Sequence, residues 1–278
     1  MTRVVLWPLL LLLGVLIMRW TSWAESRVFY IPDRAPFATP PEYVDVSIPT
    51  PDGLTLHGWL MPPAGNVPKP WPAVLHCHGN AGNVSLHADF SSFLTDHGIA
   101  VLIFDYRGYG RSSAASGLVR DKLLTDSRAA LEFLLTHPDI DPARVGALGV
   151  SLGGVFASAL AGERSEIRAV CLVNAFSSWR GVATDHAPVL GRLLIADGLD
   201  PVSNLRSGAG RPVLIVHSER DEIIHPRHAG LLADGARAGG WEATTYIAPG
   251  VDHNSVLSEG SDEQRAVAEF FVRTLAPQ

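Results

Sequence analysis

Serine, histidine and carboxylate residues at separate positions of this sequence could together carry out acyl transfer. Ser151 lies in Gly149-Val150-Ser151-Leu152-Gly153, which follows a short apolar run and precedes an alanine-rich stretch. A strand, a Gly-x-Ser-x-Gly turn and a helix in this order form a nucleophile elbow, which exposes the serine hydroxyl beyond the sheet. A Cβ at either flanking glycine would collide with the neighbouring strand or helix. The sequence therefore predicts that Ser151 is a nucleophile on a strained turn.

The base and the acid that such a serine needs are predicted from their order along the chain. Elbow enzymes carry them in the order serine, acid, histidine, and the acid orients the histidine ring. His253 lies in a loop after the last predicted strand, and Asp221 lies in the turn after the predicted strand Pro212–Ser218. That turn also contains Glu219 and Glu222, and we favour Asp221 because it occupies the middle of the turn. These two residues complete the predicted catalytic triad.

Two backbone N–H groups are expected to stabilise the negative charge that develops during acyl transfer. Leu152 begins the predicted helix after the elbow, where its N–H points toward the reacting atoms. The second donor should come from the loop after the predicted strand Ala73–His78, because the glycines of His78-Gly79-Asn80-Ala81-Gly82 let the backbone turn inward. We assign this second donor to the N–H of Asn80. Each such donor contributes roughly 3 kcal/mol of transition-state stabilisation.

Predicted strands and helices alternate from Ala73 onward, and they position these residues. This alternation predicts a mainly parallel, twisted sheet with helices on both faces, in which ligands bind at the carboxyl ends of the strands. Earlier in the chain, Tyr43–Ile48 and Leu54–Leu60 flank a turn sequence, which predicts an antiparallel hairpin at the leading edge. The other predicted strands are Ala100–Asp105, Ala169–Asn174, Pro212–Ser218 and Glu242–Ala248, and the predicted helices are Leu118–His137, Arg227–Ala238 and Ser261–Leu275.

The segment 176–210 has an irregular pattern and is predicted to form a short cap over the site. Its apolar residues include Phe176 and Trp179, which are the candidates for substrate binding. These side chains could line an acyl pocket or could only pack the cap on the domain, and the sequence favours neither interpretation.

Together these motifs resemble the α/β-hydrolase superfamily of serine hydrolases, from about Arg27 to the end of the chain. The motifs that carry the resemblance are Pro51-Asp52-Gly53-Leu54-Thr55-Leu56-His57-Gly58-Trp59, His78–Asn83, Phe104–Ser112, Gly149–Gly154, Asp221–Pro226 and His253. The resemblance implies the α/β-hydrolase fold over residues 42–278. Within the superfamily, the chain resembles the membrane-tethered branch that includes the depalmitoylase-like hydrolases.

Two features of the sequence depart from that branch. Its depalmitoylase-type members carry a cysteine-rich, lipidated amino terminus, whereas this chain has an apolar segment without cysteine there. Depalmitoylase activity is therefore not carried over to this chain. In addition, Ser218 stands where the family usually has glycine.

The first 24 residues predict export from the cytoplasm. Residues 4–18 are almost entirely apolar, and Trp20 and Trp23 follow them. This pattern fits a signal peptide that is cleaved near Ala24, which would give a secreted or periplasmic protein. It also fits an uncleaved membrane anchor with both tryptophans at the lipid interface. Residues 25–41, which are rich in proline and arginine, are predicted to be an extended lead-in.

Composition narrows the classes of function. A chain of 278 residues with a formal charge of −6 suits one large α/β domain, and it argues against a nucleic-acid partner. We predict a serine hydrolase that cleaves a small-molecule or lipid ester or thioester through an acyl-enzyme and needs no cofactor or metal ion. The alternatives are a serine peptidase of the same fold and a non-catalytic scaffold that binds a lipid or a protein.

Overall fold

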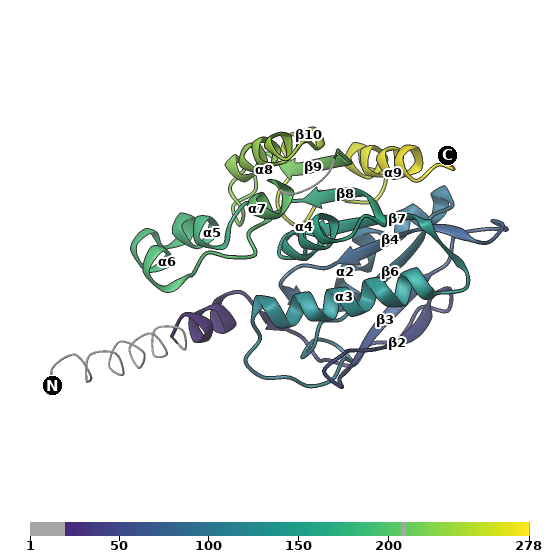
Figure 1. Cartoon of the computed structure of the whole chain (residues 1–278), viewed down its shortest axis with the longest axis horizontal. Helices are drawn as coiled ribbons and strands as arrows, with labels where there is room; N and C mark the ends of the chain where they lie inside the picture. The colour runs from purple at the N-terminus through teal and green to yellow at the C-terminus, as the bar shows by residue number, and fades with distance from the viewer. Residues whose placement is uncertain (1–19, 207–209, 278) are drawn as a thin grey trace, which may run out of the picture.

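The computed structural model describes residues 20–206 and 210–277, and at its centre is an eight-stranded sheet (Figure 1). Its strands are β2 (Val44–Pro49), β3 (Thr55–Met61), β4 (Trp71–Cys77), β6 (Ala100–Phe104), β7 (Ile140–Val150), β8 (Ile167–Val173), β9 (Pro212–Ser218) and β10 (Glu242–Ala248). They lie in the order β10-β9-β8-β7-β4-β6-β3-β2. β3 pairs antiparallel with β2 and β6, and the pairs from β6 to β10 are parallel. The predicted parallel sheet with a leading hairpin is confirmed.

Two apolar cores lie on the two faces of this sheet, and helices cover both. Ala73 and Leu75 of β4 belong to one core and Val74 to the other, because successive strand side chains point to opposite faces. The first core is covered by α3 (Arg120–Thr136), α4 (Gly153–Glu163) and α8 (Arg227–Ala238). The second is covered by α9 (Asp262–Thr274) and the short turns α2 (Val84–His87), η1 (Ala88–Phe90) and η2 (Ser92–His97). Figure 1 shows α3 and α4 lying across one face of the sheet.

The cap segment is more regular than its sequence suggested. It contains three short helices, α5 (Trp179–His186), α6 (Pro188–Leu194) and α7 (Pro201–Arg206). Local capping explains the first, because the Ser178 hydroxyl accepts the N–H of Gly181 at its amino end. Pro188 occupies the first turn of α6, where its missing N–H costs nothing. Helices of six to eight residues are too short to show a clear apolar period.

The lead-in also differs from the prediction, because residues 20–28 are helical rather than extended from residue 25. After this helix the chain is extended, and β1 (Ile31–Pro32) pairs in parallel with β5 (Ala81–Gly82). None of the helices within the described residues has the length and apolar character needed to cross a membrane. The apolar stretch at residues 4–18 lies outside the described residues.

A buried ion pair fixes the turn after β6. Arg107 donates to both carboxylate oxygens of Asp126 on α3, and the Arg107 Nη2–Asp126 Oδ1 distance is 2.7 Å. Its Nη1 also donates to Asp52 in the hairpin turn at 2.6 Å, and this bond lowers the pKa of Asp52 to about 2. Asp126 and Arg107 are both buried, so each charge depends on the other for compensation.

Removing one partner of this pair should therefore destabilise the domain. We expect Asp126→Ala to lower the free energy of unfolding by about 3–5 kcal/mol, because the Arg107 charge would stay buried without its main partner. Asp121→Ala, on the exposed first turn of the same helix, should cost less than about 1 kcal/mol. Urea denaturation of the two variants measures both values. Equal losses would show that the buried pair contributes no more than an exposed charge.

Candidate active site

Ser151 lies on a tight turn between β7 and α4, as expected for an elbow. Its φ of 52° is in the left-handed region, which a non-glycine residue adopts at a cost in strain. A Cβ at Gly149 would lie 2.6 Å from the carbonyl oxygen of Gly153, and one at Gly153 would lie 1.8 Å from that of Cys77. Both positions therefore require glycine, as the sequence predicted. The Ser151 N–H donates to the carbonyl of Val173 at 2.8 Å, which ties the turn to the end of β8.

Asp221 and His253 are joined by a hydrogen bond of 2.6 Å between Oδ2 and Nδ1. The other carboxylate oxygen, Oδ1, accepts the N–H groups of Ile223 at 2.9 Å and Ile224 at 2.7 Å. The carboxylate is thus held on both sides, and its side chain is fully buried. When Nδ1–H points at the carboxylate, the neutral ring of His253 presents Nε2 as a proton acceptor, which a general base requires.

Two residues that the sequence analysis did not select hold the loop of His253. The side-chain amide of Asn174 donates to the carbonyl of His253 at 2.9 Å and to the Ser218 hydroxyl at 3.0 Å. The Ser218 hydroxyl in turn donates to the carbonyl of Asp252 at 2.8 Å. The Asn174 carbonyl oxygen accepts the N–H of Ser218 at 2.7 Å, so the amide joins the ends of β8 and β9. The backbone on both sides of the histidine is therefore fixed from the sheet.

A sequence signal existed for both of these residues. Asn174 follows β8 with a φ of 47°, and asparagine is one of the residues that tolerate the left-handed region. A polar residue with this tolerance at the carboxyl end of a buried strand is a candidate for contact with the site. Ser218 was already notable because it replaces the glycine usual in the family. Its hydroxyl forms a bond that glycine could not make.

The oxyanion loop, residues 79–83, lies directly beside the nucleophile. A Cβ at Gly79 would be 3.8 Å from Cβ of Ser151. The Gly79 carbonyl accepts from Nδ1 of His78 at 2.8 Å, and burial lowers the pKa of this histidine so that its ring stays neutral. Because the C=O and N–H of a trans peptide point in opposite directions, this bond turns the N–H of Asn80 away from His78. Leu152, the other expected donor, is the N-cap residue of α4.

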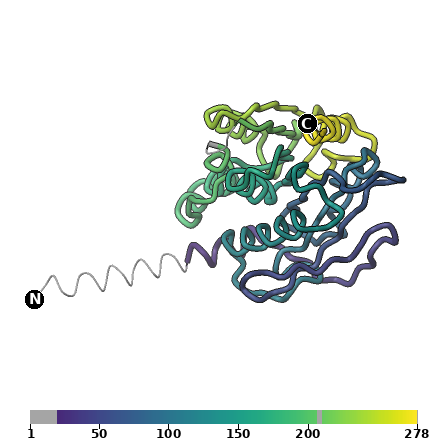
Figure 2. The backbone as a smooth tube through the Cα atoms, turned by 45° about the vertical axis from the view of Figure 1, so that its right-hand side comes forward, coloured from purple at the N-terminus to yellow at the C-terminus, as the bar shows by residue number. Residues whose placement is uncertain are grey.

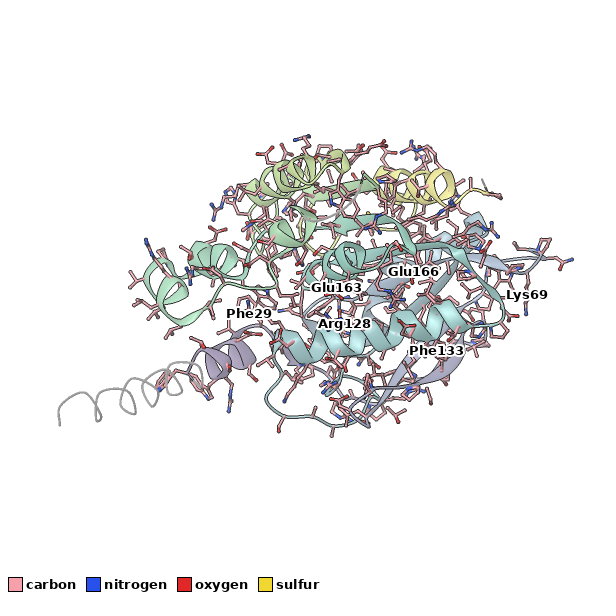
Figure 3. All side chains as sticks on the ribbon, in the orientation of Figure 1. Phe29, Lys69, Arg128, Phe133, Glu163 and Glu166 are labelled. Atoms are coloured by element: carbon pink, nitrogen blue, oxygen red, sulfur yellow. The ribbon has the colours of Figure 1, made fainter. Side chains whose placement is uncertain are left out.

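Phe176 and Trp179 are both buried in the contact between the cap and the amino-terminal segment. The ring of Trp179 lies 4.8 Å from that of Phe29, edge to face, and the Arg120 guanidinium lies 4.2 Å above it. Phe176 also contacts the Trp179 ring, at 5.2 Å. Figure 3 shows Phe29 between the amino-terminal helix and the body of the domain. In this conformation both rings are enclosed by other side chains.

A groove of about 1400 Å³ lies between the loop after β3, the turns η1 and η2, and the segment that leads into α9. Its lining includes Asn254, which adjoins His253, and Leu86, whose side chain packs against Gly82 of the oxyanion loop. The groove therefore reaches the edge of the catalytic loops.

His76 of β4 is a further buried histidine, and imidazole is a common metal ligand. Within residues 20–206 and 210–277, no three His, Cys, Asp or Glu side chains are grouped so that they could hold a metal ion. Nδ1 of His76 lies 2.8 Å from the Ser91 hydroxyl, and burial lowers the pKa of this imidazole. His76 is therefore a neutral residue of the core.

The parallel sheet, the elbow and the neighbouring Asp–His pair define the class of this protein. They are the features of an α/β-hydrolase, and the chain is a serine hydrolase of that class. Residues 86–278 match the model of the prolyl oligopeptidase family, and the chain belongs to that family.

Similar proteins are known from bacteria. The chain is 35% identical over 211 residues to the uncharacterized protein YfhR of Salmonella typhi, and the aligned residues cover 71% of each chain. It is 34% identical over 268 residues to the uncharacterized protein Rv2307c of Mycobacterium tuberculosis, and the aligned residues cover 94% of this chain and 91% of the relative.

Solved structures share the fold at low identity. An esterase of Pyrococcus furiosus, Pf2001, superposes with a TM-score of 0.74 at 19% identity, over 89% of this chain and 99% of the esterase. An acylaminoacyl peptidase of Pyrococcus horikoshii superposes with a TM-score of 0.64 at 19% identity, over 84% of this chain and 41% of the peptidase. At such identities these structures establish the α/β-hydrolase fold alone.

The contacts of Asn174 predict a role in placing the histidine loop. We expect Asn174→Ala to fold and to lower kcat by roughly 10-fold to 10²-fold, because small displacements of a catalytic group have effects of this size. Ser255→Ala is the matched control, since the Ser255 hydroxyl that it removes donates to the side chain of Asp252 in the same loop. Steady-state kinetics on a soluble ester compare the two. A kcat for Asn174→Ala equal to that of the control would contradict this role.

Proposed function

We propose that this protein hydrolyses carboxylic esters or thioesters through an acyl-enzyme on Ser151. The observation that carries the proposal is the 2.6 Å hydrogen bond between Asp221 and His253. It is accompanied by Ser151, which among the described residues is the one serine with a backbone in the left-handed region. In the first half-reaction, Ser151 Oγ attacks the acyl carbon as His253 Nε2 takes its proton. The N–H groups of Asn80 and Leu152 stabilise the oxyanion, and His253 then protonates the leaving alcohol or thiol.

In the second half-reaction, water replaces the leaving group. His253 takes a proton from the water as its oxygen attacks the acyl carbon, and the second oxyanion occupies the same donors. Collapse of this intermediate releases the carboxylic acid, and the proton returns from His253 to Ser151 Oγ. The atoms balance with water as the only co-reactant.

Likeness in fold supports ester cleavage. The chain superposes on the Pyrococcus esterase with a TM-score of 0.74 and on the acylaminoacyl peptidase with a TM-score of 0.64. A peptidase of the same fold is the second candidate, and the membership in the prolyl oligopeptidase family favours it. A scaffold without catalysis is disfavoured by the presence of a serine elbow, an Asp–His pair and two expected oxyanion donors.

We also propose that residues 1–24 are retained as a membrane anchor. Ala24 and Glu25 are buried in the folded body, so cleavage after Ala24 would create a charged amino group at a buried position, which costs desolvation energy. Trp20 and Trp23 are exposed on the helix of residues 20–28, and tryptophan is enriched at membrane interfaces.

An exposed apolar face on the cap also supports a position of the protein next to the membrane. In α6, Val189, Leu190 and Leu193 are exposed, whereas Gly191 faces Ala183 of α5. This helix thus presents three aliphatic side chains outward, whereas Leu194 packs against the core. Such an exposed apolar face is unusual for a helix in water. Figures 1 and 2 both place α6 and the start of the described chain at the same end of the molecule. A protein held there would meet acyl substrates of lipid origin.

The triad assignment predicts a specific order of effects. Ser151→Ala should lower kcat on the order of 10³-fold or more without unfolding the protein. Asp221→Asn should lower kcat by roughly 10⁴-fold, because the amide would favour the wrong tautomer of His253. Glu222→Gln is the control, since Glu222 is an exposed carboxylate in the same turn.

Turnover of p-nitrophenyl esters, acyl thioesters and aminoacyl amides by each variant measures these effects. Greater turnover of the amides would favour the peptidase. Ester turnover by Ser151→Ala close to that of the unmodified protein would end the assignment of the nucleophile.

The proposed orientation at a membrane predicts where a surface probe meets lipid. Cys77 and Cys171 are buried and free, so a cysteine introduced on the surface can be labelled selectively. With the full chain in vesicles of phosphatidylcholine and phosphatidylglycerol, an environment-sensitive fluorophore at Leu190→Cys should shift to shorter emission wavelengths. The same label at Val272→Cys, on the exposed face of α9 away from the cap, should report water.

Aqueous emission from both positions would refute contact between α6 and lipid. Mass spectrometry of the mature amino terminus tests the anchor separately. A chain that starts at Glu25 and is fully soluble would refute retention.

A further inference from the structure

The extended part of the amino-terminal segment pairs directly with the oxyanion loop. The N–H of Ile31 donates to the carbonyl of Asn80, and the N–H of Asp33 donates to the carbonyl of Gly82, both at 2.9 Å. The carbonyl of Asp33 accepts the N–H of Gly110 at 2.9 Å, which fixes this stretch to the turn after β6. We call residues 25–33 the N-terminal strap. The strap thus connects the start of the chain to Asn80, whose N–H is expected to bind the oxyanion.

Hydrogen bonds hold the two peptide groups on either side of Asn80. The peptide before it is held by His78, whose Nδ1 donates to the Gly79 carbonyl at 2.8 Å. The peptide after it is held by its own carbonyl, which accepts from Ile31 N–H at 2.9 Å and from the Tyr109 hydroxyl at 2.7 Å. The orientation of the Asn80 N–H depends on the backbone angles between these two peptides. The strap therefore supplies one of the restraints on the direction of that N–H.

The other end of the strap is held by a buried ion pair. The Glu25 carboxylate accepts from the Arg120 guanidinium at 2.8 Å, from the Arg120 backbone N–H at 2.8 Å and from the Tyr30 hydroxyl at 2.7 Å. Arg120 also donates to the carbonyl of Gly198 in the cap at 2.6 Å and lies over the Trp179 ring. Burial of Glu25 and Arg120 means that either charge would be uncompensated without the other. The strap is thus fixed at both ends to parts of the domain that surround the site.

We propose that the N-terminal strap is a positioning element for the oxyanion hole. It acts through the hydrogen bond that the N–H of Ile31 donates to the carbonyl of Asn80. The proposal rests on the proposed function, because it assumes that the N–H of Asn80 stabilises the oxyanion. The strap acts on the backbone of the oxyanion loop. It keeps the oxyanion loop in the conformation that the transition state requires, so that no reorganisation is needed during reaction. The amino-terminal segment therefore positions the oxyanion hole and also connects the domain to the start of the chain.

Ile31→Pro tests the bond, because proline has no N–H to donate and fits the extended backbone. We expect kcat on a soluble ester to fall about 10-fold to 10²-fold, with KM changed less than about twofold, since a fully lost oxyanion donor costs about 10²-fold to 10³-fold. Affinity for a trifluoromethyl ketone, which forms an oxyanion adduct with Ser151, should fall by the same factor. Ile31→Ala is the matched control, because it removes the side chain and keeps the donor. A kcat and inhibitor affinity equal in both variants would overturn the proposal.

Tyr109→Phe provides a second route if Ile31→Pro does not fold. It removes the other donor to the Asn80 carbonyl, so kcat should fall with an unchanged KM. In the Tyr109→Phe background, Ile31→Pro should cause a larger loss than it does alone. Strictly additive losses of free energy would show that the two donors do not restrain the same carbonyl.

Hydrogen exchange separates failure of this proposal from failure of the proposed function. Mass spectrometry of the peptide covering residues 79–83 should show faster amide exchange in Ile31→Pro than in Ile31→Ala. This readout needs no turnover. Faster exchange in a protein without Ser151-dependent turnover would support the strap as the restraint on the loop and reject the catalytic function. Unchanged exchange together with unchanged kcat in an active enzyme would reject the strap alone.

Discussion

Close contact between the backbones of the elbow and β4 is the constraint on which the rest of the site depends. A Cβ at Gly153 would lie 1.8 Å from the carbonyl oxygen of Cys77 and 2.8 Å from that of His78. The first turn of α4 therefore rests directly on the end of β4. This contact places the oxyanion loop beside Ser151, because that loop begins where β4 ends. It also explains the strained serine, since the chain must reverse within one residue to pass from β7 into α4.

The other catalytic groups reach the site because their strands are neighbours in the sheet. β9, β8, β7 and β4 lie side by side, and each ends in a loop that contributes to the site or supports it. The end of β8 joins these parts, because Val173 accepts the N–H of Ser151 and the side chain of Asn174 bonds Ser218 and the carbonyl of His253. The amide is fully buried, and such a group is stable there only when its donors and acceptors are paired. Hydrogen bonds between the loops at the carboxyl ends of the strands therefore hold these loops in place.

The sequence predicted those features that depend on local pattern, and it missed those that depend on distant partners. The elbow, the strands and the long helices follow from composition and period over short stretches, and their positions agree with prediction within a few residues. The pairing of Arg107 with Asp126, the bonds of Asn174 and the contact of Ile31 with Asn80 join residues 19 to 79 positions apart. No period or motif encodes such a pair in one sequence. The helix at residues 20–28 was missed because its stability comes from packing, through Ala24 and Glu25, rather than from its own pattern.

Burial of Trp179 links the amino-terminal segment to the cap. Its ring packs against Phe29 on one side and beneath Arg120 on the other, and Arg120 also binds Glu25 and the cap carbonyl of Gly198. A displacement of the strap would therefore expose part of this ring and weaken the same ion pair that holds the cap. Conversely, a substrate that required Trp179 to move would disturb the strap. Because the triad loops are fixed by the sheet, whereas the cap and the strap are fixed to each other, a change at this contact would move the cap and the strap together.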